Sequence, residues 1–115
     1  MLLNIDDILF VSHRRLFPHE EPRFFVGRVI TTEHELIKLE GFSFVRDLSS
    51  GQVIRKDEKR IKILSLASVG FFFYQLPVVE DVSNMRVQDG AGELLLMDGD
   101  RMLMNLSEQS HSGHF

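Results

Sequence analysis

Residues 23–45 read RFFVGRVITTEHELIKLEGFSFV, which is two apolar segments on either side of a short polar one. The density of Phe, Val, Ile and Leu predicts strands at residues 24–32 and 36–45, joined by a polar turn. A glycine lies inside each predicted strand, at Gly27 and at Gly41. Glycine weakens a flat strand and commonly marks a bend, a bulge or a close backbone approach. The stretch therefore predicts a hairpin of two strands that are bent at their glycines.

The pattern of apolar side chains changes at Gly41. Ile37 and Leu39 alternate with charged residues, as in a strand with one buried face. Beyond the glycine, Phe42 and Phe44 fall on the other parity. A one-residue bulge at Gly41 would bring all four side chains to the same core. We therefore expect a bulge at this glycine.

Short apolar segments separated by turn residues continue along the rest of the chain. Further strands are predicted at residues 8–17, 61–66, 71–76, 85–88, 93–97 and 101–106. The sequences DGAG and DGD separate the last three, and Asp-Gly is a strong hairpin signal, so these three form a predicted β-meander. No segment shows a helical stripe.

This pattern predicts an all-β fold, since evenly spaced short strands with turn signals are typical of barrels and sandwiches. At this size the common solutions are small barrels. We predict a small, strongly bent SH3-type barrel at residues 1–77. A C-terminal β-meander at residues 78–107 is expected to pack on the barrel, and residues 108–115 are expected to form a flexible tail.

The composition narrows the range of functions. The chain has 115 residues, enough for one domain, and no cysteine, which excludes disulfides, thiolate catalysis and the usual structural zinc sites. A net charge of −4 disfavours nucleic-acid binding over the whole surface but leaves room for a local basic patch. The N-terminus has no basic region ahead of an apolar stretch, and no apolar run approaches ~18 residues. We expect a cytoplasmic protein without a membrane span.

No residue pattern predicts an enzyme. His13, His19 and His34 lie near predicted strand ends and turns with no converging acid or metal ligand, so they are expected to be surface histidines. His111 and His114 lie in the polar tail. The serines lack a His–acid pair, and there is no glycine-rich phosphate loop. We expect no catalytic residue, no metal site and no cofactor.

Somewhat more than half of the chain resembles the Sm, Lsm and Hfq-like family of small barrels. The first family signature is an aromatic-apolar strand with a glycine, an acidic turn and an apolar strand ending in an acid. Here Phe24-Phe25-Val26-Gly27-Arg28-Val29, then Glu33, then Ile37-Lys38-Leu39-Glu40 match it. The second signature is a strand, an Arg-Gly turn and a final strand, and residues 61–66, 67–70 and 71–77 have that layout.

The resemblance implies a fold and a mode of assembly. It covers about residues 8–77 and implies an Sm-like barrel. Proteins of this family form closed rings by pairing the last strand of one subunit with the fourth strand of its neighbour. A cyclic homo-oligomer of roughly five to seven subunits is therefore expected. Phe71, Phe72 and Phe73 are the predicted interface residues, because alternation places Phe72 on the opposite face from the other two and an edge strand needs cover.

The sequence departs from the family at the base-binding positions. The RNA-binding Asn of the family falls on Ile37, or on Leu36 if the turn is one residue shorter, and neither side chain can hydrogen-bond a base. Val69 stands before Gly70 where the family has Arg. Glu33 can stand for the acidic residue that holds the turn. The family's uridine pocket is therefore not carried over.

Basic residues nevertheless form two clusters that could contact phosphates. The predicted nucleic-acid-binding residues are Arg14, Arg15, His34, Arg55, Lys56 and Arg60. Asp57 and Glu58 interrupt the second cluster, so a solvated loop of mixed charge is the competing interpretation. The first functional hypothesis is a non-enzymatic Sm-like ring that binds RNA or serves as a scaffold. The alternative is a structural or adaptor subunit of a larger, phage-derived assembly that binds no nucleic acid.

Overall fold

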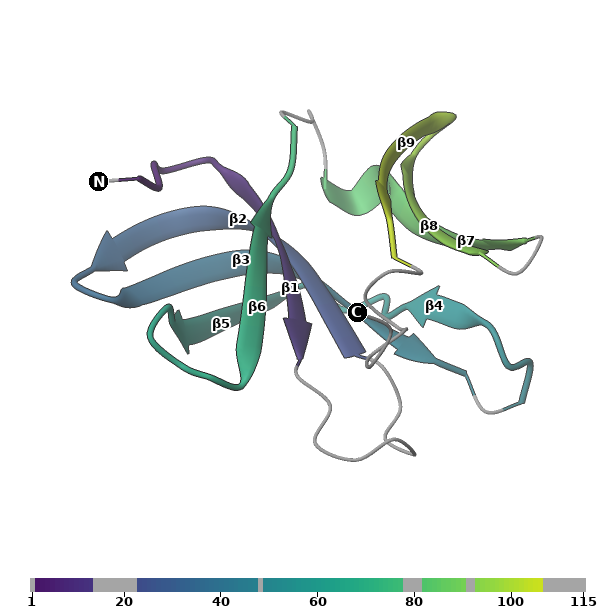
Figure 1. Ribbon diagram of the computed structural model, residues 1–115, viewed down its shortest axis with the longest axis horizontal. Helices are drawn as coiled ribbons and strands as arrows, with labels where there is room; N and C mark the ends of the chain where they lie inside the picture. The colour runs from purple at the N-terminus through teal and green to yellow at the C-terminus, as the bar shows by residue number, and fades with distance from the viewer. Residues whose placement is uncertain (1, 14–22, 48, 78–81, 91–92, 107–115) are drawn as a thin grey trace, which may run out of the picture.

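The computed structural model of the protein describes residues 2–13, 23–47, 49–77, 82–90 and 93–106. These residues form two antiparallel sheets (Figure 1). The strands of the first sheet are β1 (Ile8–His13), β2 (Arg23–Glu33), β3 (Leu36–Arg46), β4 (Val53–Arg55), β5 (Arg60–Ser65) and β6 (Phe71–Gln75). A 3₁₀ turn, η1 (Val82–Asn84), leads to the second sheet, which consists of β7 (Met85–Gly90), β8 (Glu93–Asp98) and β9 (Arg101–Asn105). The predicted all-β class and the C-terminal meander are thus confirmed.

The first sheet has the strand order β4-β3-β2-β1-β6, and β5 pairs with β3 beside β4. β3 carries both short strands on the same edge, with β4 opposite residues 44–46 and β5 opposite residues 36–41. Within the described part of the chain, β5 and β6 do not pair with each other, so the sheet is curved and open (Figure 1). The closed barrel expected from the sequence is therefore not found.

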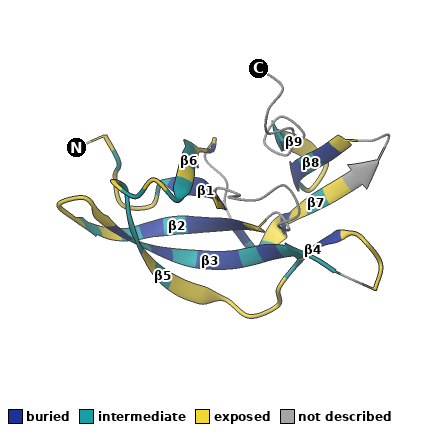
Figure 2. Ribbon diagram, turned by 60° about the horizontal axis from the view of Figure 1, so that its bottom comes forward, coloured by how far each residue is buried: buried dark blue, intermediate teal, exposed yellow. Residues whose placement is uncertain are grey.

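Both faces of the first sheet are buried, each in a core of its own. One face contributes Phe10, Phe24, Phe42 and other residues to the first core, which it shares with residues of the second sheet such as Met85 and Leu96. The opposite face forms the second core, which consists of Leu9, Val11, Phe25, Val29, Ile37 and Leu39. β2 and β3 are consequently buried along most of their length, whereas β5 is largely exposed (Figure 2).

The bulge predicted at Gly41 is wrong. Gly41 pairs directly with Gly27, and the register of β2 and β3 shifts between Val29 and Thr31, where Ile30 is the extra residue. The physical reason is that the sheet has two cores. Residues on both parities of β3 can be buried without any bulge, so Ile37 and Phe42 simply point into different cores.

The two central glycines permit a close approach of β2 and β3. A Cβ atom placed on Gly41 would overlap the carbonyl oxygen of Val26 and lie 2.6 Å from the Cα of Gly27. A Cβ on Gly27 would lie 2.8 Å from the ring of Phe25 and 3.1 Å from the carbonyl oxygen of Glu40. The contacts under 3.0 Å are too short for real Cβ atoms, so a close backbone approach is what requires glycine here.

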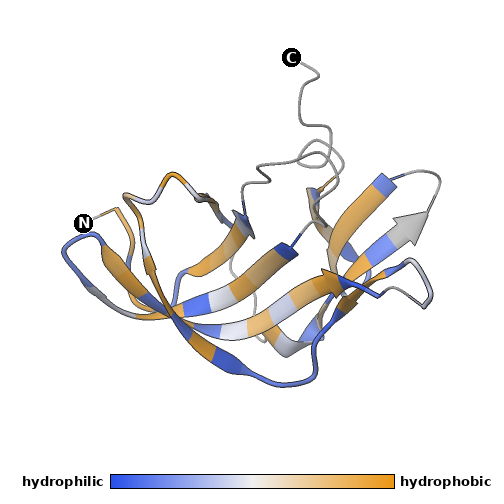
Figure 3. Ribbon diagram, turned by 90° about the horizontal axis from the view of Figure 1, so that it is seen from below, coloured by the Kyte–Doolittle hydropathy of each residue, from blue (hydrophilic) through white to orange (hydrophobic). Residues whose placement is uncertain are grey.

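Hydrophobic residues lie along the strands and hydrophilic residues in the connecting turns (Figure 3). The β2–β3 hairpin closes at His34 and Glu35, between the paired residues Glu33 and Leu36. His34 takes a φ of 55°, in the left-handed region that histidine tolerates better than most residues. In the described residues, no helix is long and apolar enough to cross a membrane.

Candidate anion-binding site

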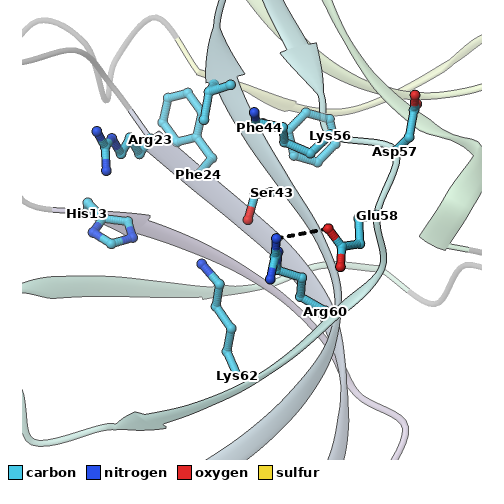
Figure 4. A pocket seen from close by; sticks show the side chains of 11 residues that line it. His13, Arg23, Phe24, Ser43, Phe44, Lys56, Asp57, Glu58, Arg60 and Lys62 are labelled. Carbon is cyan, nitrogen blue, oxygen red and sulfur yellow. Dashed lines mark hydrogen bonds and ion pairs between the residues drawn. The ribbon is translucent and has the colours of Figure 1, made fainter.

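A cavity of about 450 Å³ opens at the end of the second core. Four elements surround it: the end of β1, the start of β2, the last part of β3 and the segment that runs from β4 into β5. We call it the cationic pocket, because its ionisable lining residues are His13, Arg23, Lys56, Arg60 and Lys62, with Asp57 and Glu58 as the acids. Figure 4 shows their arrangement around Ser43. A volume of this size falls within the range of about 300–1,000 Å³ that holds small ligands in proteins.

Strand alternation explains why the cations meet here. On β1, Leu9 and Val11 point into the second core, and His13, two residues after Val11, lies on the same face. Arg23 lies two residues before Phe25 on β2, and Lys62 lies two residues before Leu64 on β5, so each shares the face of a residue packed in the second core. Because side chains two residues apart share a face, each strand that fills the second core also places a basic group at its open end. The pocket is thus a continuation of the core in which apolar side chains are replaced by cations.

Two of the basic side chains that line the pocket contact aromatic rings. The Nζ atom of Lys62 lies 4.8 Å from the centroid of the Phe25 ring, a cation–π contact with a buried side chain. The ring of His13 packs edge-on against Phe71 of β6, with 4.9 Å between the ring centroids. These contacts hold the lysine and the histidine against apolar surface while their polar atoms remain at the cavity.

The cations repel one another. Burial lowers the pKa of Lys62, and the charges of Arg60 and Arg23 lower it further. Burial likewise lowers the pKa of His13, with additional effects from Lys62 and then Arg23. Among the described residues, no acid contributes to either shift. Like charges that disfavour one another's protonated forms mark a site that an anion would stabilise.

One cation of the cluster is neutralised within the chain. The Nη2 atom of Arg60 lies 2.9 Å from Oε2 of Glu58, in an ion pair whose side chains are both largely exposed. Among the residues that the structure describes, neither Arg23 nor Lys62 pairs with an acid. Within the described residues, Arg23, Lys56 and Lys62 therefore line the cavity without an ion-pair partner. Asp57 offsets one of these three charges, and His13 can add a further positive charge.

Comparison with known protein families, curated proteins and solved structures finds no match for this chain. The site is therefore interpreted from its own geometry.

Two of the predicted nucleic-acid-binding residues, Lys56 and Arg60, line the cationic pocket. Arg55 lies outside it, since its guanidinium sits 4.5 Å from the centroid of the Phe42 ring and donates a hydrogen bond to the carbonyl oxygen of Ser83. His34 lies at the opposite end of the β2–β3 hairpin from Arg23. Arg14 and Arg15 fall outside the described residues. RNA contacts at these four positions stay predictions.

Sequence reasoning missed three members of the pocket. Arg23 and Lys62 were not singled out, and His13 was expected to be an isolated surface residue. A signal was present in the alternation, because each of these residues occupies a position of its strand that would otherwise hold an apolar core side chain. Recognising the signal requires knowing that the three strand positions adjoin, which only the pairing of the strands reveals.

The predicted interface residues alternate as expected. Phe71 and Phe73 are partly buried against the second core, whereas Phe72 is 48% exposed. All three lie on β6, whose outer edge is free in the described structure. On the other side of the sheet, β5 also has a free edge and exposes Ile61 and Ile63.

Proposed function

We propose that the chain is a non-enzymatic, Sm-like protein that assembles into a ring and binds RNA through phosphate contacts in the cationic pocket. The observation that carries this proposal is the pair of cations, Arg23 and Lys62, that face a cavity without an acidic partner among the described residues. Phosphate is the anion that RNA presents at every nucleotide, and contacts with it dominate the affinity of proteins for nucleic acids.

Base recognition has little part in this proposal. Leu36 is an exposed residue of the β2–β3 hairpin, and Ile37 is buried in the second core, so neither offers a polar group to a base. Binding through phosphates alone predicts weak dependence on base sequence and strong dependence on salt. The protein's net charge of −4 agrees with a local site rather than a basic surface.

Assembly into a ring is supported by the free edges of the first sheet. β5 is the fourth strand of this sheet when the three-residue strand β4 is left out, and β6 is the last. These are the two strands that the family resemblance assigns to subunit contacts. Exposed Phe72 on one edge and exposed Ile61 and Ile63 on the other favour covering by another copy. The proposed cytoplasmic location is supported by the absence of cysteine.

The test is binding of a fluorescent single-stranded RNA, measured by anisotropy over a series of salt concentrations. The wild-type protein should bind with an affinity that falls steeply as salt rises. The double variant Arg23→Gln/Lys62→Gln should bind more weakly, with a salt slope smaller by about 0.7 for each phosphate that it no longer neutralises. Lys38→Gln is the matched control, because Lys38 lies on the other face of β3. An equal weakening of RNA binding in the control and in the double variant would refute the proposal.

The alternative of a structural or adaptor subunit without nucleic-acid binding is favoured by the same free edges. Native mass measurement distinguishes the two functions when it is combined with the RNA experiment. A ring that shows no RNA binding at low salt supports the structural subunit.

A further inference from the structure

The charge of the cationic pocket indicates which kind of phosphate it fits. Arg23, Lys56 and Lys62 form no ion pair within the described structure, and Asp57 offsets one of their charges, so two positive charges remain. His13 can supply one more, whereas Arg60 is held by Glu58. An internal phosphodiester of RNA carries one negative charge. A phosphate monoester carries about −1.5 to −2 at neutral pH, because its second pKa is near 6. Two fixed cations and a protonatable histidine therefore match a monoester better than a diester.

The location of the pocket points the same way. The pocket lies beside the second core, because its lining residue Lys62 contacts the buried ring of Phe25. Lys62 and His13 are held against aromatic rings, by Phe25 and Phe71 respectively. A terminal phosphate can reach cations that are held against the sheet in this way with a single nucleotide behind it. An internal phosphate would have to bring nucleotides on both sides.

We propose that the cationic pocket binds a terminal phosphate monoester, held by Arg23 and Lys62, and that His13 joins these contacts in its protonated form. This proposal specifies the class of ligand that the cationic pocket binds. It rests on the proposed function only in the case that the monoester is the end of an RNA. The 5′ end, the 3′ end and a free nucleotide share this chemistry.

The charged groups around His13 determine the direction of its response. Arg23 faces it from β2, and Lys62 and Arg60 from β5, while Lys56, Asp57 and Glu58 line the pocket from the segment between β4 and β5. Burial and then the charges of Lys62 and Arg23 lower the pKa of His13, which favours the neutral ring. A bound dianion reverses the sign of the local potential and raises that pKa.

Binding is therefore coupled to the uptake of a proton. Affinity should increase as pH falls from 8, by at most about tenfold per pH unit for one proton taken up. Below about pH 6 the monoester itself becomes protonated and loses its second charge. This offsets the gain from protonation of His13, so the increase in affinity should level off near pH 6.

The first experiment compares hexauridylates that carry a 5′-phosphate, a 3′-phosphate or no terminal phosphate, together with uridine monophosphate. At least one phosphorylated ligand should bind about tenfold or more tightly than the unphosphorylated oligonucleotide, since hydrogen bonds to charged groups are among the strongest. Comparison of the 5′, 3′ and free-nucleotide ligands identifies the source of the monoester. Equal affinities of phosphorylated and unphosphorylated RNA would overturn the proposal.

The second experiment follows the imidazole proton signals of His13 by NMR as pH is varied, with and without inorganic phosphate. Phosphate should raise the pKa of His13, and His13→Asn should remove the dependence of affinity on pH between 8 and about 6.5. Lys38→Gln should leave both properties as in the wild type. An unchanged pKa of His13 in saturating phosphate would overturn the proposal without any variant being needed.

The two proposals fail in different ways. If unphosphorylated RNA binds as tightly as phosphorylated RNA and the double variant weakens both, the pocket binds the RNA backbone and the monoester proposal is wrong. If phosphate and phosphorylated ends raise the pKa of His13 but longer RNA gains no affinity over uridine monophosphate, the monoester proposal holds and RNA-backbone binding is wrong.

Discussion

Gly27 and Gly41 face each other across β2 and β3 at a place where the two backbones leave no room for a side chain. The consequences of adding a methyl group differ at the two positions. At Gly41 the new Cβ would meet backbone atoms of Val26 and Gly27, which cannot move without separating the strands. At Gly27 its closest neighbour would be the ring edge of Phe25, which has some freedom to rotate.

We predict that Gly41→Ala destabilises the protein by roughly 3 kcal/mol or more, at or beyond the upper end of what overpacking commonly costs. Gly27→Ala should cost less, on the order of 1–3 kcal/mol. Urea unfolding followed by circular dichroism measures both. Gly70→Ala is the control, since its Cβ would meet only Ser68 Oγ, at 3.4 Å, and should change stability by less than about 0.5 kcal/mol. A Gly41→Ala protein as stable as the control would contradict the close approach of the two strands.

The core side chains of β3 show which features of the fold could be predicted from the sequence. The alternation in β3 correctly paired Ile37 with Leu39 and Phe42 with Phe44, but the bulge expected at Gly41 wrongly placed all four in one core. It could not indicate how many cores the sheet has, because a parity change is compatible with a bulge and with burial on both faces. The second sheet, which supplies the other half of the first core, lies more than thirty residues further along the chain. The alternation within β3 therefore could not show that this second sheet packs against Phe42 and Phe44.

Among the elements, β4 is the shortest strand and connects the two sheets. Its last residue, Arg55, stacks on Phe42 of β3 and donates a hydrogen bond to the carbonyl oxygen of Ser83 in η1. β4 was not predicted as a strand, because three residues are too few to show alternation. The charged sequence after it suggested instead that Arg55 belongs to a nucleic-acid-binding cluster.

These contacts predict that Arg55→Ala lowers stability by about 1–2 kcal/mol, because the variant can form neither the cation–π contact nor the hydrogen bond. Affinity for RNA should stay within a factor of about two, because Arg55 does not line the cationic pocket. Anisotropy with the same hexauridylates, on protein shown to be folded, provides the measurement. A tenfold weaker RNA affinity in a folded Arg55→Ala protein would restore Arg55 to the binding surface and weaken the case for the pocket.

Edge strands β5 and β6 lead to a prediction about assembly. Phe72 is half exposed on β6, where it pairs with Ser12 of β1 and has no strand beyond it in the described structure. If this edge is covered by another subunit, Phe72→Asp places a charge in an apolar contact and should shift the protein from ring to monomer. Val69→Asp is the control, because Val69 is 80% exposed in the turn between β5 and β6. Native mass spectrometry should find an intact ring for the control and monomer for Phe72→Asp; an intact ring for both excludes β6 from the interface.

The pocket is also a property of paired elements rather than of one segment. His13, Arg23 and Lys62 are distant in sequence and belong to no motif. They come together because β1 pairs with β2, β2 with β3 and β3 with β5, each in a register that aligns the ends of their inward faces. Registers of this kind could not be derived from the sequence, although the strands themselves largely could.

At the scale of the whole molecule, the first core is shared between the two sheets. Val82, Met85, Leu94, Leu96 and Leu106 cover the face of the first sheet that carries Phe24 and Phe42. The sequence suggested a barrel at residues 1–77 with a meander added to it. The shared core instead makes the second sheet part of what keeps the first one folded, because the first sheet alone would expose a row of aromatic side chains.

Removal of residues 78–115 should therefore abolish stable folding of the remainder. Burial of a large apolar side chain contributes about 1.5–3 kcal/mol, so the covering side chains together contribute on the order of 10 kcal/mol. That is comparable with the whole stability of a small domain, about 5–15 kcal/mol. The fragment 1–77 should be insoluble or should lack a cooperative thermal transition, whereas removal of residues 108–115 alone should leave the melting temperature within a few degrees of the full chain. A soluble 1–77 fragment with a sharp transition would mean that the second core is sufficient by itself and that the meander is an independent addition.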